Sequence, residues 1–287
     1  MALGVFGAIF LFFVALVFLL PMTGKGGGLF GGGEKMAVLE VQGVIASSKR
    51  IIENLHGFRD NPAVKAIVLR VDSPGGGVGP SQEIYEELKK TAKVKPLVVS
   101  MGSVAASGGY YIAVPAQKIF ANPGTITGSI GVLLEFVNLE ELFGKIGLKV
   151  QVIKSGEHKD MGSPTRTLRP EEKRLLQEFI GNVHSQFVRA VAANRPLDEE
   201  KVRALADGRI FSGEQALKEG LVDELGNLQD AIGYAAGLAG IKGEPKIIYP
   251  PRQSMGLWEF FLDQGQSRLK EIFPETGVGL NFIWNGY

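Results

Sequence analysis

Short runs of apolar, often β-branched residues alternate along most of the chain with stretches of helical periodicity, and this alternation restricts the possible folds more than any other feature. The strand-like runs are AVLEVQGVIA, AIVLRVDSP, LVVSMGSVAASG, KIFANPGTITGSIGV and LKVQVIKSG, with helical stretches such as KRIIENLHGFRDNP and IYEELKKTA between them. Because parallel neighbours need crossover connections, strands separated by helices predict a mainly parallel sheet covered by helices. The expected fold class is therefore α/β.

The last third of the chain has a different pattern. A long amphipathic helix is expected from Pro170, since apolar residues recur there at helical spacing and a proline is tolerated in the first turn. Shorter helical stretches punctuated by glycines follow. From Lys246 on, the sequence mixes prolines with the aromatic residues Trp258, Phe260, Phe261, Phe273, Phe282 and Trp284. These aromatic side chains could contact another subunit or the membrane, but we favour burial against the chain's own core.

Residues 3–20 carry no charged side chain and, as a helix, would span roughly 27 Å, close to the hydrocarbon thickness of a bilayer. No Lys or Arg precedes this run, so a transmembrane anchor is favoured over a cleaved signal peptide. The glycine-rich segment that follows is expected to act as a flexible tether. The sequence thus predicts an anchor over residues 1–22, a tether over 23–35, an α/β domain over 36–245 and an aromatic-rich extension over 246–287.

Composition excludes several classes of function. The chain has 31 Lys and Arg against 30 Asp and Glu, a formal net charge of +1, so no strong field attracts nucleic acid. The absence of cysteine removes disulfides, thiolate metal sites and cysteine nucleophiles. The three histidines, His56, His158 and His184, are too scattered for a metal cluster. We expect no nucleic-acid partner, no metal and no cofactor.

A glycine cluster, Gly75, Gly76 and Gly77, directly follows the apolar strand AIVLRV and the residues Asp-Ser-Pro. Glycine clusters after strands expose backbone N–H groups to anions, as in phosphate-binding loops and oxyanion holes. The segment has neither the GK[ST] ending of a P-loop nor GxGxxG spacing. An oxyanion hole and a plain tight turn both remain open on this motif alone.

A second cluster places Ser107 among small residues in Val-Ala-Ala-Ser-Gly-Gly-Tyr-Tyr, at an expected strand-to-helix junction. Ser107 is the candidate nucleophile, and tight helix packing is the alternative explanation for the small residues. Ser103 lies nearby in a more strand-like context and ranks lower. No GxSxG motif is present, which disfavours an α/β-hydrolase.

A serine nucleophile needs a base, either a histidine or a neutral lysine. His56 and His184 lie in amphipathic helices, where a structural role is the better interpretation. The polar loop after LKVQVI supplies Lys154 and Lys159, and a lysine becomes a base when apolar burial favours its neutral form. Ser129, in Thr-Gly-Ser-Ile-Gly-Val, could orient such an amine, although a surface lysine is the simpler interpretation of either residue.

Four motifs in this order, SPGGG, AASGGYY, PGTITGSIGV and SGxxKDMGSP, resemble the short form of the bacterial signal peptide peptidase A family over residues 36–240. The resemblance implies that Ser107 is the nucleophile, Lys159 the general base and Ser129 the hydroxyl that orients the lysine. By likeness to this family and its caseinolytic-protease relatives, the N–H groups of Gly76 and Gly108 form the oxyanion hole. It also implies a crotonase-like fold and a dome-shaped octamer whose sites take serine and lysine from adjacent subunits.

The resemblance further implies a single-pass protein of a prokaryotic cytoplasmic membrane, with its catalytic domain outside; Lys25 and Lys35 alone would weakly favour the cytoplasmic side. The expected substrates are signal peptides left in the membrane after preprotein cleavage, whose apolar regions suit a hydrophobic, small-residue pocket. Other possibilities are a membrane protease that cuts a stomatin-like partner, a crotonase-type acyl-CoA enzyme, and a catalytically inactive scaffold.

Overall fold

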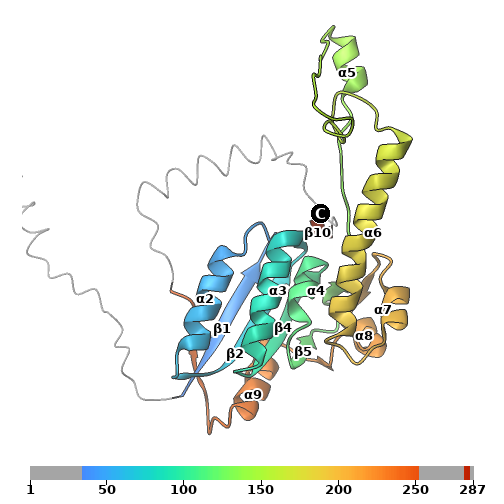
Figure 1. Ribbon diagram of the computed structural model, residues 1–287. Helices are drawn as coiled ribbons and strands as arrows, with labels where there is room; N and C mark the ends of the chain where they lie inside the picture. The colour runs from blue at the N-terminus through green and yellow to red at the C-terminus, as the bar shows by residue number, and fades with distance from the viewer. Residues whose placement is uncertain (1–33, 252–280, 285–287) are drawn as a thin grey trace, which may run out of the picture. The chain divides into compact units, whose positions relative to one another are not determined.

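The computed structural model describes residues 34–251 and 281–284 (Figure 1). The predicted transmembrane anchor and most of the tether lie outside the described residues, as do Trp258, Phe260, Phe261 and Phe273. Within the described ranges, no helix has the length and apolar character needed to cross a membrane.

The predicted parallel sheet is confirmed. In the described part of the chain, eight strands form one sheet in the order β7-β6-β4-β2-β1-β9. In addition, β5 pairs with β4 and β8 pairs with β5, and only the β6–β7 pair is antiparallel. The strands are β1 (Lys35–Gln42), β2 (Val64–Ser73), β4 (Leu97–Ala106), β5 (Lys118–Ala121), β6 (Ile126–Gly128), β7 (Ile210–Ser212), β8 (Glu224–Leu225) and β9 (Lys246–Ile248). Since β9 pairs with β1, the residues just after 245 belong to this sheet.

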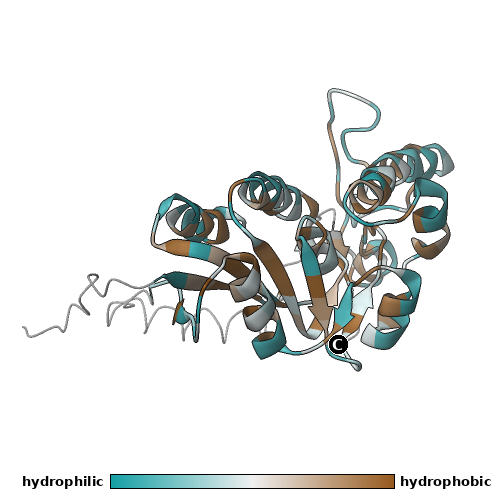
Figure 2. Cartoon of the chain, turned by 90° about the horizontal axis from the view of Figure 1, so that it is seen from below, coloured by the Kyte–Doolittle hydropathy of each residue, from teal (hydrophilic) through white to brown (hydrophobic). Residues whose placement is uncertain are grey.

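The central strands are buried on both faces. Along β2, Ile67, Leu69 and Val71 pack into one hydrophobic cluster, whereas Ala66 and Val68 pack into a second. Successive side chains of a strand point to opposite faces, so a sheet covered on both sides needs such continuous apolar runs. Figure 2 shows these brown strands beneath helices whose outward faces are largely teal.

Helices cover the two faces unequally. Side chains from α2, α3, α4 and α6 join the first cluster, and α9 supplies Ala231, Ile232, Ala235 and Ala236 to the second (Figure 1). The helices that lie over the sheet or follow α6 are α2 (Lys49–Asp60), α3 (Val78–Ala92), α4 (Gly108–Ala113), α6 (Pro170–Ala192), α7 (Glu199–Leu205), α8 (Gly213–Glu219) and α9 (Leu228–Leu238). The long helix expected from Pro170 is therefore present as α6.

A small second sheet lies at the edge of this core. The predicted glycine cluster forms β3 (Gly75–Gly77), which pairs antiparallel with β10 (Asn281–Ile283). The side chain of Phe282 is fully buried in the first hydrophobic cluster. For this aromatic residue, burial against the chain's own core is confirmed.

Residues 133–169, here called the arm, extend away from the sheet and include the short helix α5 (Glu140–Lys145) (Figure 1). The sequence predicted a strand over LKVQVI in this segment, and that prediction is wrong: residues 148–153 form no strand. Their alternating pattern is not matched by a neighbouring strand of the same chain, and Leu148, Val150, Val152 and Ile153 remain exposed. The alternation in the sequence therefore did not mark a buried sheet position.

An ion network fixes the end of the arm to the first turn of α6. Arg166 donates to Asp160 at 2.9 Å and to Glu172 at 2.7 Å, and Arg169 also donates to Glu172, at 2.8 Å. Lys154 donates to Asp160 at 2.6 Å. Hydrogen bonds from Arg166 and then Lys154 lower the pKa of Asp160, and hydrogen bonds from Arg166 and then Arg169 lower that of Glu172. Both carboxylates are therefore held ionised.

We expect Arg166→Met to lower the melting temperature by several degrees at pH 7, with a difference that narrows as the pH falls. Because the folded-state pKa values of Asp160 and Glu172 lie below their unfolded values of about 4, their contribution is complete above pH 5 and is lost as the pH falls through the folded values. Thermal unfolding measured by circular dichroism from pH 7 to pH 2 tests this.

The matched control is Arg203→Met, which removes an exposed pair with Glu199 within α7. Exposed pairs of this kind contribute about 0.3–0.5 kcal/mol, so this variant should differ little from the parent at any pH. A constant melting difference between Arg166→Met and the parent across the whole pH range would contradict the stabilising role assigned to the network.

Candidate active site

Two serines follow neighbouring strands at the same level of the sheet. Ala106, the last residue of β4, faces Gly128, the last residue of β6, in a parallel pair. Ser107 and Ser129 come next, and the N–H of Ser107 donates to the carbonyl of Gly128 at 2.8 Å. Because parallel strands end at the same edge of a sheet, this register brings the two hydroxyl residues together.

Both serines have left-handed backbone conformations. Ser107 has φ 51° and ψ −115° at the junction between β4 and α4, and Ser129 has φ 49°. Such φ values are uncommon for residues other than glycine, and residues held in this way cluster at functional sites. The predicted strand-to-helix junction is present, and its sharp turn is similar to the nucleophile elbow of hydrolases that carry a GxSxG motif, which this chain lacks.

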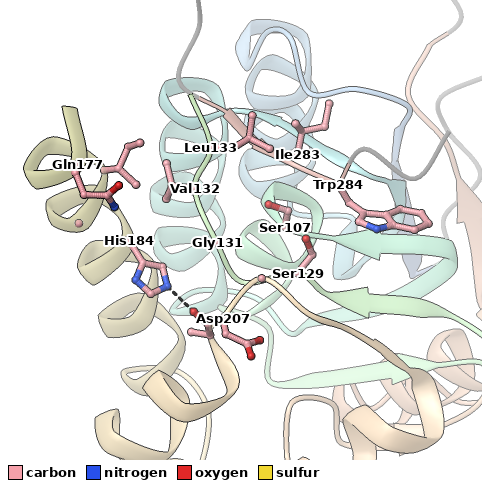
Figure 3. Close-up of a pocket in the computed structure, with 14 residues that line it drawn as sticks. Ser107, Ser129, Gly131, Val132, Leu133, Gln177, His184, Asp207, Ile283 and Trp284 are labelled. Carbon is pink, nitrogen blue, oxygen red and sulfur yellow. Dashed lines mark hydrogen bonds between the residues drawn. The ribbon is translucent and has the colours of Figure 1, made fainter. Parts of the chain in front are cut away.

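A cavity of about 420 Å³ opens beside the two serines. Ser107 and Ser129 lie together on one side of it, and His184 from α6 is drawn on the other (Figure 3). The described residues that line it are Ser107, Ser129, Gly131, Val132, Leu133, Gln177, Ile180, Gly181, His184, Ala206, Asp207, Gly208, Ile283 and Trp284. Ser107 lines the cavity and is only 1% exposed, so its hydroxyl is largely shielded from solvent.

The two glycines predicted to form an oxyanion hole lie next to this cavity. Gly76 lies between the backbone of Ile45 and the strand β10. A Cβ atom on Gly76 would collide with the carbonyl of Ile45. A Cβ on Gly108 would lie 2.7 Å from the hydroxyl oxygen of Ser81. Only glycine fits such close backbone approaches. The carbonyl oxygen of Phe282 also lies 3.0 Å from that Cβ position on Gly108.

The structure does not bring Lys159 to Ser107 within one chain. Lys159 is exposed on the arm and does not line the cavity. Lys154, the other lysine of this loop, donates hydrogen bonds to the carboxylate of Asp160 and to the carbonyl of Glu157. The assignment of Lys159 as the base therefore stays a prediction that requires a second copy of the chain.

Two other groups with acid–base chemistry line the cavity, and sequence reasoning did not place either of them there. His184 contacts the carbonyl of Ala206 at 2.7 Å through Nε2; since a carbonyl only accepts, this nitrogen carries the proton. Asp207 is held by Arg209, whose hydrogen bond lowers its pKa to about 2, too low for a general base at neutral pH. Nothing in the local sequence marked these two residues, because the loop after α7 meets α6 only in the folded chain.

A further residue that sequence reasoning missed is Ser81, in α3. Its hydroxyl is buried and lacks a hydrogen-bond partner among the described residues, and it lies beside Gly108. No group of three His, Asp or Glu side chains within residues 34–251 and 281–284 could hold a metal ion. What the site offers is a buried serine hydroxyl, a second hydroxyl residue and closely packed glycine backbone, which together are suited to acyl transfer.

Comparisons with known families agree with this chemistry. The model of peptidase family S49 matches residues 89–242, and that of Clp protease matches residues 35–125. The two matches overlap over residues 89–125, which include β4, α4 and β5, so the candidate nucleophile lies within both.

Individual relatives are similar over most of the chain. A candidate protease of Synechocystis is 44% identical over 88% of this chain and 91% of its own length. A candidate signal peptide peptidase SppA of Enterococcus faecium is 39% identical over 69% of this chain and 62% of its own length. Protease 4 of Salmonella typhi is 40% identical over 85% of this chain but only 41% of its own length.

The strained conformation of Ser107 generates a stability prediction. At φ 51° and ψ −115°, glycine has no Cβ penalty, whereas alanine keeps it. We expect Ser107→Gly to be more stable than Ser107→Ala by about 1 kcal/mol, since such strain amounts to about 1–3 kcal/mol and glycine's greater unfolded-state entropy offsets part of it. Urea unfolding of the two variants measures the difference.

Ser103 provides the control, because it lies exposed in β4 and does not have a positive φ. There the order should reverse, with Ser103→Gly less stable than Ser103→Ala by about 0.5–1 kcal/mol. If glycine were the less stable replacement at position 107 as well, the strain assigned to the junction would be absent.

Proposed function

The chain belongs to peptidase family S49 and is a serine endopeptidase, and we propose that it cuts peptides with Ser107 as nucleophile, Lys159 as general base and Ser129 as the hydroxyl that orients the lysine. The observation that carries the proposal is the register of β4 and β6, which sets the two serines next to each other in strained conformations at the wall of one cavity. Positive φ values are unfavourable for serine, and residues held in such strained conformations cluster at functional sites, so a purely structural role does not explain why both serines adopt them.

In the proposed reaction, the neutral amine of Lys159 takes the proton of the Ser107 hydroxyl, and the serine oxygen attacks a peptide carbonyl. The backbone N–H groups of Gly76 and Gly108 stabilise the negative charge that develops on the carbonyl oxygen. Support for these two donors comes from their positions, since Gly108 directly follows Ser107 and packs against Gly75, the neighbour of Gly76. Neither Gly76 nor Gly108 has room for a side chain.

The second half of the reaction uses the same groups. The protonated lysine gives its proton to the leaving amine, which departs with the carboxyl-side fragment and leaves an ester on Ser107. The neutral lysine then removes a proton from water, whose oxygen attacks the ester. The lysine returns this proton to the Ser107 oxygen as the ester bond breaks and the new carboxyl end of the amino-side fragment is released. One amine thus acts twice as base and twice as acid, as required of a two-residue site.

We propose that each site takes its lysine from a neighbouring subunit in a homo-oligomer of crotonase-like chains. Two observations support this: Lys159 is exposed on the arm, away from its own cavity, and the arm exposes many apolar side chains that a partner could cover. These side chains are Val137, Leu142, Ile146, Leu148, Val150, Val152 and Ile153. We also propose that this homo-oligomer is an octamer.

We propose further that residues 3–20 anchor the protein in a cytoplasmic membrane, with the catalytic domain outside. The apolar length of this run supports the anchor, and a relative named as a candidate signal peptide peptidase supports signal peptides as the substrate class. Cleaved signal peptides remain in the bilayer, so an anchored peptidase meets them at high local concentration.

We expect Ser107→Ala and Lys159→Ala each to reduce kcat for a fluorogenic peptide by at least about 10³-fold, because nucleophile and base act as one unit. His184→Ala, which changes the alternative base lining the cavity, should keep most of the activity. Near-normal activity of Lys159→Ala together with loss in His184→Ala would reverse the assignment of the base.

Mixing the two inactive variants tests the shared site. When Ser107→Ala and Lys159→Ala chains are co-expressed, some neighbouring pairs combine an intact serine with an intact lysine. A substantial fraction of activity should therefore return, and a serine-directed phosphonate probe should label only the Lys159→Ala chains. Continued inactivity of a mixed oligomer, verified by two different affinity tags, would contradict a site built between subunits.

The substrate class is tested with purified protein in detergent. Synthetic signal peptides should be degraded with a higher kcat/KM than equally long peptides from a stomatin-like protein. The opposite preference would favour the related membrane proteases that act on such partners.

A further inference from the structure

The strand β4 contains a bulge shortly before the candidate nucleophile. Its first half pairs with β2 in regular register, up to Met101 opposite Val71, but the next pair is Ala105 with Ser73. A single residue of β2 therefore lies against residues 102–104 of β4. Extra residues of this kind bend a strand, and they occur beside active sites, where they redirect a side chain.

The bulge coincides with a change of partner for β4. Before the bulge, β4 pairs with β5, up to Ser100 opposite Phe120. After it, β4 pairs with β6, beginning with Val104 opposite Ile126. The pairing with β6 is the one that brings the two serines of the site together. The shape of the bulge therefore determines where the nucleophile lies.

The side chain of Asp72, the single residue of β2 at this point, fills the bulge. Its Oδ1 accepts a hydrogen bond from the N–H of Val104 at 3.0 Å. A Cβ atom on Gly102 would lie 2.7 Å from the carboxyl carbon of Asp72, so only glycine leaves room for the carboxylate. A backbone donor that a regular strand pairs with a carbonyl is thus paired with a side chain.

Other side chains complete the bulge by donating to its carbonyl groups. Arg70 and Asn122 donate to the carbonyl of Met101, at 2.9 and 3.1 Å. The hydroxyl of Thr125 donates to the carbonyl of the next residue at 2.7 Å. These three side chains supply donors, whereas Asp72 supplies an acceptor. Its contribution can therefore be replaced only by another acceptor of similar shape.

We propose that Asp72 is a positioning residue for Ser107: its carboxylate fixes the bulge of β4, and the bulge sets the position and backbone conformation of the nucleophile. This inference rests on the proposed function, in which Ser107 attacks the substrate. Asp72 does not line the cavity, so it acts through the backbone of β4 and not by contact with the reacting atoms. Its partner Val104 precedes Ser107 on the same strand, so a shift of the bulge displaces the serine directly.

The first experiment compares Asp72→Asn with Asp72→Leu in the full chain, purified in detergent. Asparagine keeps an oxygen acceptor, whereas leucine has a similar size but leaves the N–H of Val104 without its partner. We expect kcat for a fluorogenic peptide to fall at least about 30-fold in Asp72→Leu and less than about threefold in Asp72→Asn, because a displacement of about 1 Å can cost about 10²-fold. KM should change little in either variant. Equal losses of kcat in the two variants overturn the proposal.

Gly102→Ala tests the same contact from the other strand. Its methyl group would displace the carboxylate of Asp72, so kcat should fall as it does in Asp72→Leu. Gly57→Ala in α2 is the matched control, because a Cβ there meets no atom within 4 Å and its φ is not positive. Its kcat should equal that of the parent chain. An equally normal kcat in Gly102→Ala contradicts the role of this contact.

Labelling with a serine-directed phosphonate separates displacement of Ser107 from loss of folded protein. Displacement predicts that Asp72→Leu chains are labelled completely, with a rate constant at least about tenfold lower than that of the parent chain. If Asp72 served only to stabilise the fold, fewer chains would be labelled, and these would react at the parent rate. That second result overturns the proposal.

Hydrogen exchange tests the placement without catalysis. The amides of residues 104–107 should exchange at least about tenfold faster in Asp72→Leu than in Asp72→Asn, because loss of the acceptor makes local opening easier. Mass spectrometry of the peptides that cover this segment measures the rates, and equal rates overturn the inference. A parent chain that the phosphonate does not label at Ser107 would refute the proposed function instead, and the exchange rates would still decide the role of Asp72.

Discussion

The parallel pairing of β4 with β6 is the interaction on which the site depends. Its register ends both strands at the same level, and the hydrogen bond from Ser107 to Gly128 turns the chain sharply where β4 gives way to α4. The strand β4 places side chains in both hydrophobic clusters, so it cannot slide by one residue without exposing an entire set of apolar side chains. The stability of the whole sheet thereby maintains two locally unfavourable backbone conformations.

Much of the fold followed from local pattern. The long apolar runs of β1, β2 and β4 and the helical spacing after Pro170 are properties of short stretches of sequence, and the structure has these elements where they were expected. The same reliance on local pattern explains the wrong prediction of a strand over residues 148–153. Periodicity indicates that one face of a segment is apolar, but it does not indicate whether that face packs against the same chain or against another molecule.

The candidate site was only partly accessible to the same reasoning. Ser107 and Gly76 were candidates because small residues follow a strand at both positions. A tight turn or close helix packing could also explain these residues, and only the order of the four motifs favoured a catalytic role. The roles of Ser81, His184 and Asp207 in lining or flanking the site depend on contacts between distant elements, and Phe282 reaches β3 from more than two hundred residues away in sequence. No local spacing encodes such contacts, so a single sequence could not have revealed them.

The helix α6 joins two parts of the molecule that have so far been described separately. Its 23 residues extend over about 34 Å. The first turn is clamped to the arm through Glu172, the middle contributes Ile180 and His184 to the cavity, and Phe187 further along packs on the ring of Phe282. A helix of this length moves as a stiff rod, so the tilt of the arm, the width of the cavity and the packing around Phe282 form one mechanical coordinate. In the homo-oligomer proposed above, a neighbouring subunit that contacts the arm would also set the width of the cavity in the subunit it contacts.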